Sequence, residues 1–122
     1  MKPNSLSPHT RWDSFRFAFN GINRFCRQEA HARLYLVATI LVGLATCYFH
    51  VTRSEITVLV LVTGFVWFAE MINTAIERIV DMISPGYHPQ AGLIKDIAAG
   101  AVLVAAFVAF ITGLLVFIPK IF

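Results

Sequence analysis

A run of 22 residues without a charged side chain, residues 97–118, most constrains what this chain can fold into. About 20 apolar residues in a helix span the hydrocarbon core of a bilayer. Residues 34–52 form a second uncharged segment, and a third apolar run opens at Ile56. The chain has 57% hydrophobic and 14% charged residues, whereas a soluble domain carries about 25% charged residues. We therefore predict an all-α integral membrane protein with three spanning helices.

The segments before and between these runs complete the predicted organisation. We expect one membrane domain over residues 1–122, with a disordered tail (1–10), an interfacial helix (11–32) and transmembrane helices at 33–52, 56–83 and 93–119. Apolar residues recur at helical spacing in the interfacial segment: Trp12, Phe15, Phe19, Ile22 and Cys26. Basic and amide side chains fall between them, as in an amphipathic helix on a membrane surface. The alternative is a helix packed against the spans as ordinary core.

Lysine and arginine are distributed unevenly along the chain. Six precede the first span, one lies in the first loop, two lie between the second and third spans, and one is near the end. Three spans place eight of these on one side and two on the other. The positive-inside rule then predicts a cytoplasmic N-terminus and an extracytoplasmic C-terminus.

The second span carries a polar seam, which we define as Glu70, Asn73, Glu77 and Asp81. Offsets of three, seven and eleven place all four on one stripe of a helix. A charged residue at a bilayer centre costs ~2.5–3.5 kcal/mol on insertion scales, so such residues are usually functional. The outer part of this span, residues 56–68, has no polar seam, so no continuous path for an ion crosses the membrane. A site open to the cytoplasm on one side and to lipid on the other fits better.

The chemistry of the seam is compatible with phosphoryl transfer. Carboxylates and an amide can hold Mg²⁺ and accept a proton, and Lys95 and nearby arginines can bind phosphate. The nucleotide, hydrolase and zinc motifs of soluble enzymes are absent. The residues by themselves leave two interpretations about equally open: an enzyme, or a non-catalytic oligomeric membrane protein or small transporter with a structural seam.

The connections and helix faces give further expectations. Ser54 can cap the second span, residues 84–92 read as a loop because of their prolines and glycines, and Asp96 can act as a helix-start carboxylate. Span three places small residues four apart (Ala101, Ala105, Ala109 and Gly113), which favours close helix packing in lipid. We expect other subunits to cover this ribbon or the seam.

Three segments closely resemble the prokaryotic diacylglycerol kinase and undecaprenol kinase family of small membrane enzymes. They are Glu70-Met-Ile-Asn-Thr-Ala-Ile-Glu-Arg-Ile-Val-Asp81, Ser84-Pro-Gly-Tyr-His-Pro89 and Lys95-Asp-Ile-Ala-Ala-Gly-Ala-Val102. Glu29-Ala-His-Ala-Arg33 is similar to the family's E-A-x-x-R segment, more loosely. The resemblance runs from about Ser14 to the C-terminus.

The resemblance implies a homotrimeric lipid kinase of a bacterial inner membrane that transfers the γ-phosphoryl group of Mg·ATP to a lipid hydroxyl at the cytoplasmic membrane edge. It implies that Glu29 and Glu77 hold the Mg²⁺, that Glu70 is the general base and that Asn73 positions the reacting groups. The nucleotide site would be formed by Asp81, Tyr87, His88, Lys95 and Asp96. No nucleic-acid partner is expected. Diacylglycerol and undecaprenol both stay open as substrates, because features of both branches occur in the chain.

Overall fold

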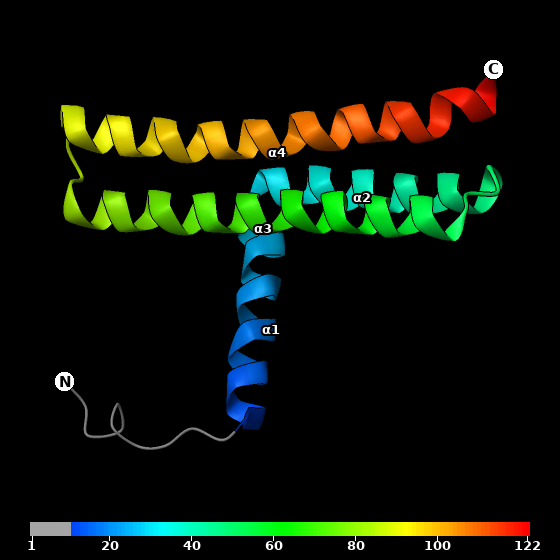
Figure 1. Cartoon of the computed structure of the whole chain (residues 1–122). Coiled ribbons are helices and arrows are strands. Elements are labelled where there is room, and N and C mark those ends of the chain that lie inside the picture. The colour runs from blue at the N-terminus through cyan, green and yellow to red at the C-terminus, as the bar shows by residue number, and fades with distance from the viewer. Residues whose placement is uncertain (1–10) are drawn as a thin grey trace. The chain divides into compact units, whose positions relative to one another are not determined.

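The computed structural model describes residues 11–122, so the expected tail at 1–10 lies outside the described residues. This part of the chain is helical throughout, with α1 (Arg11–Gln28), α2 (Ala30–Tyr48), α3 (Arg53–Ile83) and α4 (Pro89–Ile121) (Figure 1). Among the described residues, three helices, α2, α3 and α4, are long and apolar enough to cross a membrane. The expected all-α fold with three spans is confirmed. The chain divides into two compact units, one ending at Ala38 and one of Thr39–Phe122.

In the first unit, α1 is an amphipathic helix whose aromatic residues, among them Trp12 and Phe19, are exposed. The helix ends at Gln28, four residues before the bound expected from the sequence, and α2 begins at Ala30. Glu29 lies between them, outside both helices. Its N–H donates to the Phe25 carbonyl at 3.1 Å, and its carbonyl accepts from the Ala32 N–H at 3.2 Å. These two hydrogen bonds connect the end of α1 to the start of α2 across Glu29.

The second unit is organised around α3 and α4, which run side by side in opposite directions (Figure 1). Four buried residues of α3 are seven apart: Leu59, Val66, Asn73 and Val80. On α4, the buried residues Ala98 and Ala105 are also seven apart. A seven-residue repeat keeps one face of a helix toward its partner, as in coiled coils, and alanine lets helix backbones approach closely. Asn73 therefore occupies a packing position that its neighbours in the row fill with apolar side chains.

Ion pairs join α3 and α4 near both ends. Lys120 Nζ lies 2.9 Å from Glu55 Oε1 at the start of α3, and Lys95 Nζ lies 2.5 Å from Asp81 Oδ1 near its end. In antiparallel helices, two such pairs define one register along the whole length of the contact. The two ion pairs, one near each end of the contact, therefore fix how α4 is aligned along the polar seam.

The link between α2 and α3 is capped by Thr52. Its side chain accepts from the Glu55 N–H at 3.2 Å, and Glu55 Oε1 accepts from the Thr52 N–H at 3.0 Å. The expectation that Ser54 caps this helix is wrong, because the reciprocal Thr52–Glu55 capping box starts α3 at Arg53 and leaves Ser54 within its first turn. His50, with φ 53°, takes the left-handed conformation in the preceding turn.

The link between α3 and α4 is shorter than expected. His88 is the N-cap of α4, and its Nδ1 accepts from the Gln90 N–H at 3.1 Å, with Pro89 as the first helical residue. Proline suits this position because it has no N–H to satisfy. The expected loop at 84–92 is therefore too long, and the expectation that Asp96 stands at a helix start is wrong, since α4 begins seven residues earlier.

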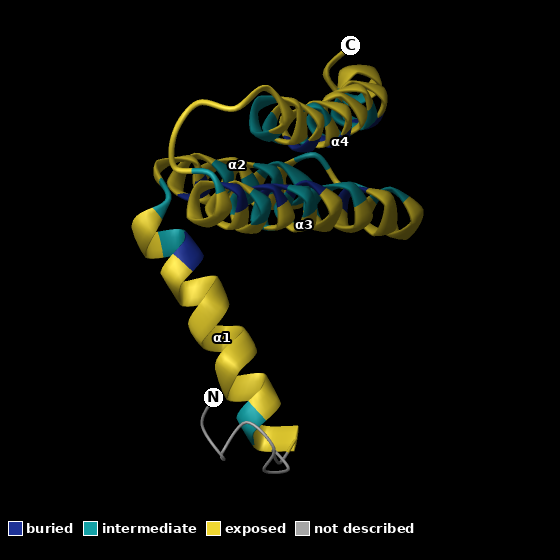
Figure 2. Cartoon of the chain, turned by 90° about the vertical axis from the view of Figure 1, so that its left-hand side faces the viewer, coloured by how far each residue is buried: buried dark blue, intermediate teal, exposed yellow. Residues whose placement is uncertain are grey.

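Most of the surface of the three apolar helices is exposed in the single chain (Figure 2). Within the small-residue ribbon of α4, Ala105 is only 1% exposed, whereas Ala101 is open. Large apolar side chains such as Leu103 and Leu115 are also exposed. Exposed apolar surface of this extent is suited to lipid or to further subunits.

Candidate active site

The polar seam runs along the last four turns of α3, and its residues change from buried to exposed toward the end of the helix. Glu70 and Asn73 are 8% and 7% exposed, and they are the buried polar residues of the described part of the chain. Glu77 and Asp81, one and two turns farther on, are exposed. The seam thus presents polar groups both inside the packed helices and at their open end.

Asn73 and Glu77 are directly bonded. Asn73 Nδ2 donates to Glu77 Oε1 at 2.8 Å, across one turn of α3. Asn73 Oδ1 is buried and, among the described residues, has no hydrogen-bond partner. A buried oxygen without a partner costs about 1–3 kcal/mol. Its lone pairs are available to a ligand that the chain alone does not supply.

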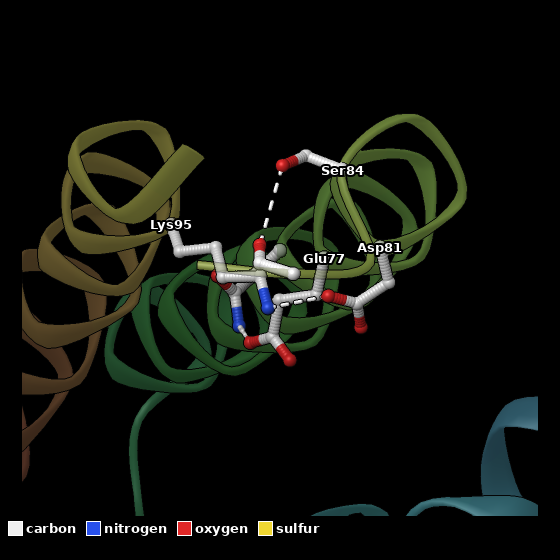
Figure 3. Close-up of polar contacts among 6 residues, drawn as sticks. Glu77, Asp81, Ser84 and Lys95 are labelled. Carbon is white, nitrogen blue, oxygen red and sulfur yellow. Dashed lines mark hydrogen bonds and ion pairs between the residues drawn. The ribbon is translucent and has the colours of Figure 1, made fainter. Parts of the chain in front are cut away.

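Lys95 brings a positive charge from α4 to the same end of the seam. Its ammonium group donates to Asp81 Oδ1 of α3, and both side chains are partly exposed (Figure 3). In the following link, Ser84 Oγ donates to the Gly86 carbonyl at 3.3 Å. An acceptor and a cation held side by side at the rim can bind a charged, phosphorylated molecule.

An apolar groove of about 160 Å³ adjoins the buried part of the seam. It is lined by Phe65, Phe68, Ala69, Ile72, Asn73 and Ile76 of α3 and by Ala98 and Ala101 of α4. Asn73 is the one polar residue in this lining. An amide that faces hydrocarbon on one side and a carboxylate on the other stands where apolar and charged reactants can meet.

The structure places the residues expected from the sequence in different settings. Within the second unit it brings Asn73 close to Glu77 and Asp81 close to Lys95. Tyr87, 94% exposed, and Asp96 lie open to the surroundings, and the His88 imidazole is engaged as a helix cap. Glu29 belongs to the first unit.

One contact was missed by sequence reasoning. Trp67 Nε1 donates to Thr39 Oγ1 at 2.8 Å and joins α3 to α2. The signal that could have drawn attention to it is a tryptophan inside a span, because a buried indole N–H usually finds a partner. The partner itself depends on how the two helices pack, which the sequence does not reveal.

Fold and site together define a class: an all-helical membrane protein with a cluster of carboxylates, an amide and a lysine where two apolar helices meet. The family model "Prokaryotic diacylglycerol kinase" matches residues 16–117. The chain belongs to this family. The lipid-kinase activity expected from the sequence is confirmed at the level of the family, and this sets aside the non-catalytic alternative.

Curated relatives carry two activity names. The chain is 37% identical to an undecaprenol kinase of Bacillus subtilis, over 88% of this chain and 87% of that protein. It is 35% identical to a diacylglycerol kinase of Synechocystis sp., over 87% of this chain and 61% of that protein. It is 33% identical to a diacylglycerol kinase of Escherichia coli, over 79% of each chain. The similar identities do not favour one lipid over the other.

Proposed function

We propose that this chain transfers the γ-phosphoryl group of Mg·ATP to the hydroxyl group of a membrane lipid, diacylglycerol or undecaprenol. The observation that carries the proposal is the buried, unpartnered Asn73 Oδ1. It lies between the buried Glu70 and the exposed Glu77 on one helix face and beside an apolar groove. A lipid hydroxyl approaching from the membrane and a phosphate approaching from water would meet at this point.

Glu70 is the proposed general base. Its carboxylate is buried one turn before Asn73, on the side of the seam that faces away from the open end of α3. There it would accept the proton of the lipid hydroxyl while the hydroxyl oxygen attacks the γ-phosphorus. The bond from the γ-phosphorus to the bridging oxygen breaks, and ADP leaves. Asn73 would hold the reacting groups in line, and positioning of this kind accounts for much of catalysis in phosphoryl transfer.

The metal ion is proposed to bind Glu77 together with Glu29. The donor set fits Mg²⁺, which prefers oxygen ligands and is usually held by one or two carboxylates plus substrate phosphates. Within residues 11–122, no group of three or more His, Cys, Asp or Glu side chains could hold a metal ion. A site formed by two carboxylates and the phosphate oxygens of ATP does not require three such side chains. Bound there, the ion would neutralise charge on the phosphate oxygens.

The nucleotide is proposed to bind at the exposed rim. Lys95 offers a cation for phosphate, and the adjacent Asp81 orients it. Tyr87, His88 and Asp96 would line the same site. His88 also starts α4, so the N-terminus of this helix, with its partial positive charge, adds to the attraction for an anion.

The proposed topology follows the distribution of basic residues. The N-terminus and the link between α3 and α4 would be cytoplasmic, and the C-terminus extracytoplasmic. The active unit is proposed to be a homotrimer, because the described chain leaves large apolar faces of α2–α4 exposed. These faces would meet lipid and neighbouring subunits.

The proposal is tested by incubating the purified protein in detergent–lipid micelles with Mg·[γ-³²P]ATP and either diacylglycerol or undecaprenol. Label in one lipid identifies the substrate. Folded protein that labels neither lipid refutes the proposed reaction. An Asn73→Asp variant is a useful companion, because it keeps the shape of the side chain while adding a charge beside Glu77.

A further inference from the structure

Helix α1 carries two neighbouring stripes of different chemistry. The apolar stripe, as we define it, consists of Trp12, Phe15, Phe19 and Ile22. The donor stripe consists of Arg16, Asn20, Asn23 and Arg27. In the donor stripe, offsets of four, seven and eleven residues keep the side chains within about 60° of one another. The centres of the two stripes are about 90° apart around the helix, so apolar groups and hydrogen-bond donors lie side by side along α1.

The apolar stripe is open to the surroundings. Trp12 is 82% exposed and Phe19 is 67% exposed, and Figure 2 shows most of α1 as exposed. A helix with exposed aromatic residues on one side and arginines beside them is suited to the boundary between headgroups and acyl chains of a membrane. The occupant that this surface fits is therefore a lipid surface.

The charges of α1 favour an anionic headgroup over a zwitterionic one. The helix has four arginines against one aspartate, hence a net charge of +3. Its single carboxylate, that of Asp13, already accepts from Arg16 Nη2 at 3.0 Å. It is thus engaged, and α1 has no second carboxylate for the ammonium group of phosphatidylcholine or phosphatidylethanolamine. Guanidinium groups, by contrast, bind phosphate oxygens through paired N–H donors.

Arg27 is the cation of the donor stripe that is left for a lipid phosphate. It is exposed, and among the described residues none forms an ion pair with it. Asn23, one turn earlier and also exposed, adds amide donors. Arg27 is eight residues after Phe19, about 80° around the helix. A long side chain at this angle can reach the headgroups while the aromatic rings lie among acyl chains.

We propose that the two stripes of α1 form a binding surface selective for anionic phospholipids of the bilayer, with Arg27 providing most of the selectivity. The ligand is a membrane phosphodiester lipid and not a soluble phosphate. This inference goes beyond the proposed kinase reaction and does not rest on it, since no substrate or nucleotide takes part.

The test measures which lipid surrounds Trp12 in the full chain. The chain has two tryptophans, so Trp67→Phe leaves Trp12 as the probe. Bilayers contain equal amounts of phosphatidylglycerol and phosphatidylcholine, and one of the two lipids carries brominated acyl chains, which quench tryptophan fluorescence on contact. Quenching by brominated phosphatidylglycerol should be at least about twofold stronger, because one basic residue near an anionic surface favours binding by about fivefold.

A matched pair of variants assigns the selectivity to the donor stripe. Arg24 lies five residues after Phe19 and nine after Phe15, about 140° and 180° around the helix. Arg24→Gln and Arg27→Gln remove the same charge from opposite sides of α1. Arg27→Gln should bring the quenching ratio close to one, whereas Arg24→Gln should keep most of the preference. Melting temperatures should stay unchanged, since both side chains are exposed.

Three controls identify the source of the preference. Raising the salt concentration from about 0.1 to about 1 M should abolish it, because the Debye length falls from about 10 to about 3 Å. Soluble glycerol 3-phosphate at a few millimolar should leave it unchanged. In Trp12→Phe, where Trp67 within α3 is the remaining probe, the two brominated lipids should quench about equally.

Equal quenching of Trp12 by both brominated lipids would overturn the proposal. So would the same loss of preference in Arg24→Gln and Arg27→Gln, which would assign it to the overall charge of α1. A Trp12 that neither lipid quenches would show that protein, such as a second copy of the chain, covers the apolar stripe. Loss of the preference in glycerol 3-phosphate would indicate a site for soluble phosphate, which also contradicts the proposal.

Discussion

Asp81 of α3 holds the Lys95 ammonium of α4 at 2.5 Å, at the exposed end of the polar seam. Both side chains are partly exposed, so this ion pair contributes little to folding. The ion pair matters for position, because it holds a cation beside the carboxylates of the proposed nucleotide and metal site. A bound phosphate and Asp81 would share the three donors of this ammonium group.

Removing this cation should therefore affect nucleotide use more than stability. Lys95→Gln should raise the KM for ATP roughly tenfold or more, since charge-assisted hydrogen bonds to phosphate are strong. Asp81→Asn should raise it less, because the cation remains. Melting temperatures should change little in either variant. Steady-state kinetics at varied ATP checks this, and an unchanged KM in Lys95→Gln would contradict the assignment.

We expect Asn73 to support activity and to lower the stability of the fold. It occupies the heptad row between Val66 and Val80, and its Oδ1 has no partner among the described residues. Asn73→Leu fills the position with an apolar side chain and removes the unpaired oxygen, so the melting temperature should rise by about a few degrees. Turnover should fall by about two orders of magnitude or more.

The matched control for Asn73→Leu is Val66→Ala, one heptad earlier in the same row. It leaves a small cavity and should lower the melting temperature while leaving the KM for ATP unchanged. Thermal unfolding and lipid-kinase assays on the same preparations separate the two effects. A destabilised Asn73→Leu protein would show that the amide is needed for packing.

Loss of the ion pair between Glu55 and Lys120 should affect stability and leave activity unchanged. Glu55 takes part both in the Thr52 capping box and in the pair with Lys120. Glu55→Gln can keep the capping box, because glutamine also serves at that position, but it loses the charge that attracts Lys120. We expect a modest fall in the melting temperature with unchanged kcat and KM. Altered kinetics would mean that the outer end of α3 and α4 communicates with the site.

Topology is open to a direct test. A phosphatase reporter fused after Phe122 should be active, because the basic residues predict an extracytoplasmic C-terminus. A fusion in the link at Gly86 should be inactive, with the complementary result for a cytoplasmic reporter. Activity of the reporter at Gly86 would contradict the proposed cytoplasmic site.

The apolar runs predicted the helices well, because a chain of this composition has few ways to satisfy its backbone in lipid. The periodicity also predicted the stripe from Glu70 to Asp81, since residues on a single helix are ordered by helical geometry alone. Helix starts were harder: Thr52 and His88 were passed over for Ser54 and Asp96, whose side chains are the more common helix caps.

Contacts between helices could not be predicted from the sequence. The Trp67–Thr39 bond and the Glu55–Lys120 pair depend on the register of one helix against another. The same holds for the absence of a partner for Asn73 Oδ1 within the described chain. Such features follow from packing, where each position offers several candidate partners.

The measurement that tests the account most directly compares Glu70→Gln with Glu77→Gln. Both variants should fold and lose nearly all turnover, because one removes the proposed base and the other a proposed metal ligand. Calorimetric titration with Mg·ATP separates them: Glu70→Gln should bind nucleotide as the wild type does, and Glu77→Gln should bind it at least about tenfold more weakly. Equal nucleotide affinity in the two variants would contradict the proposed division of roles along α3.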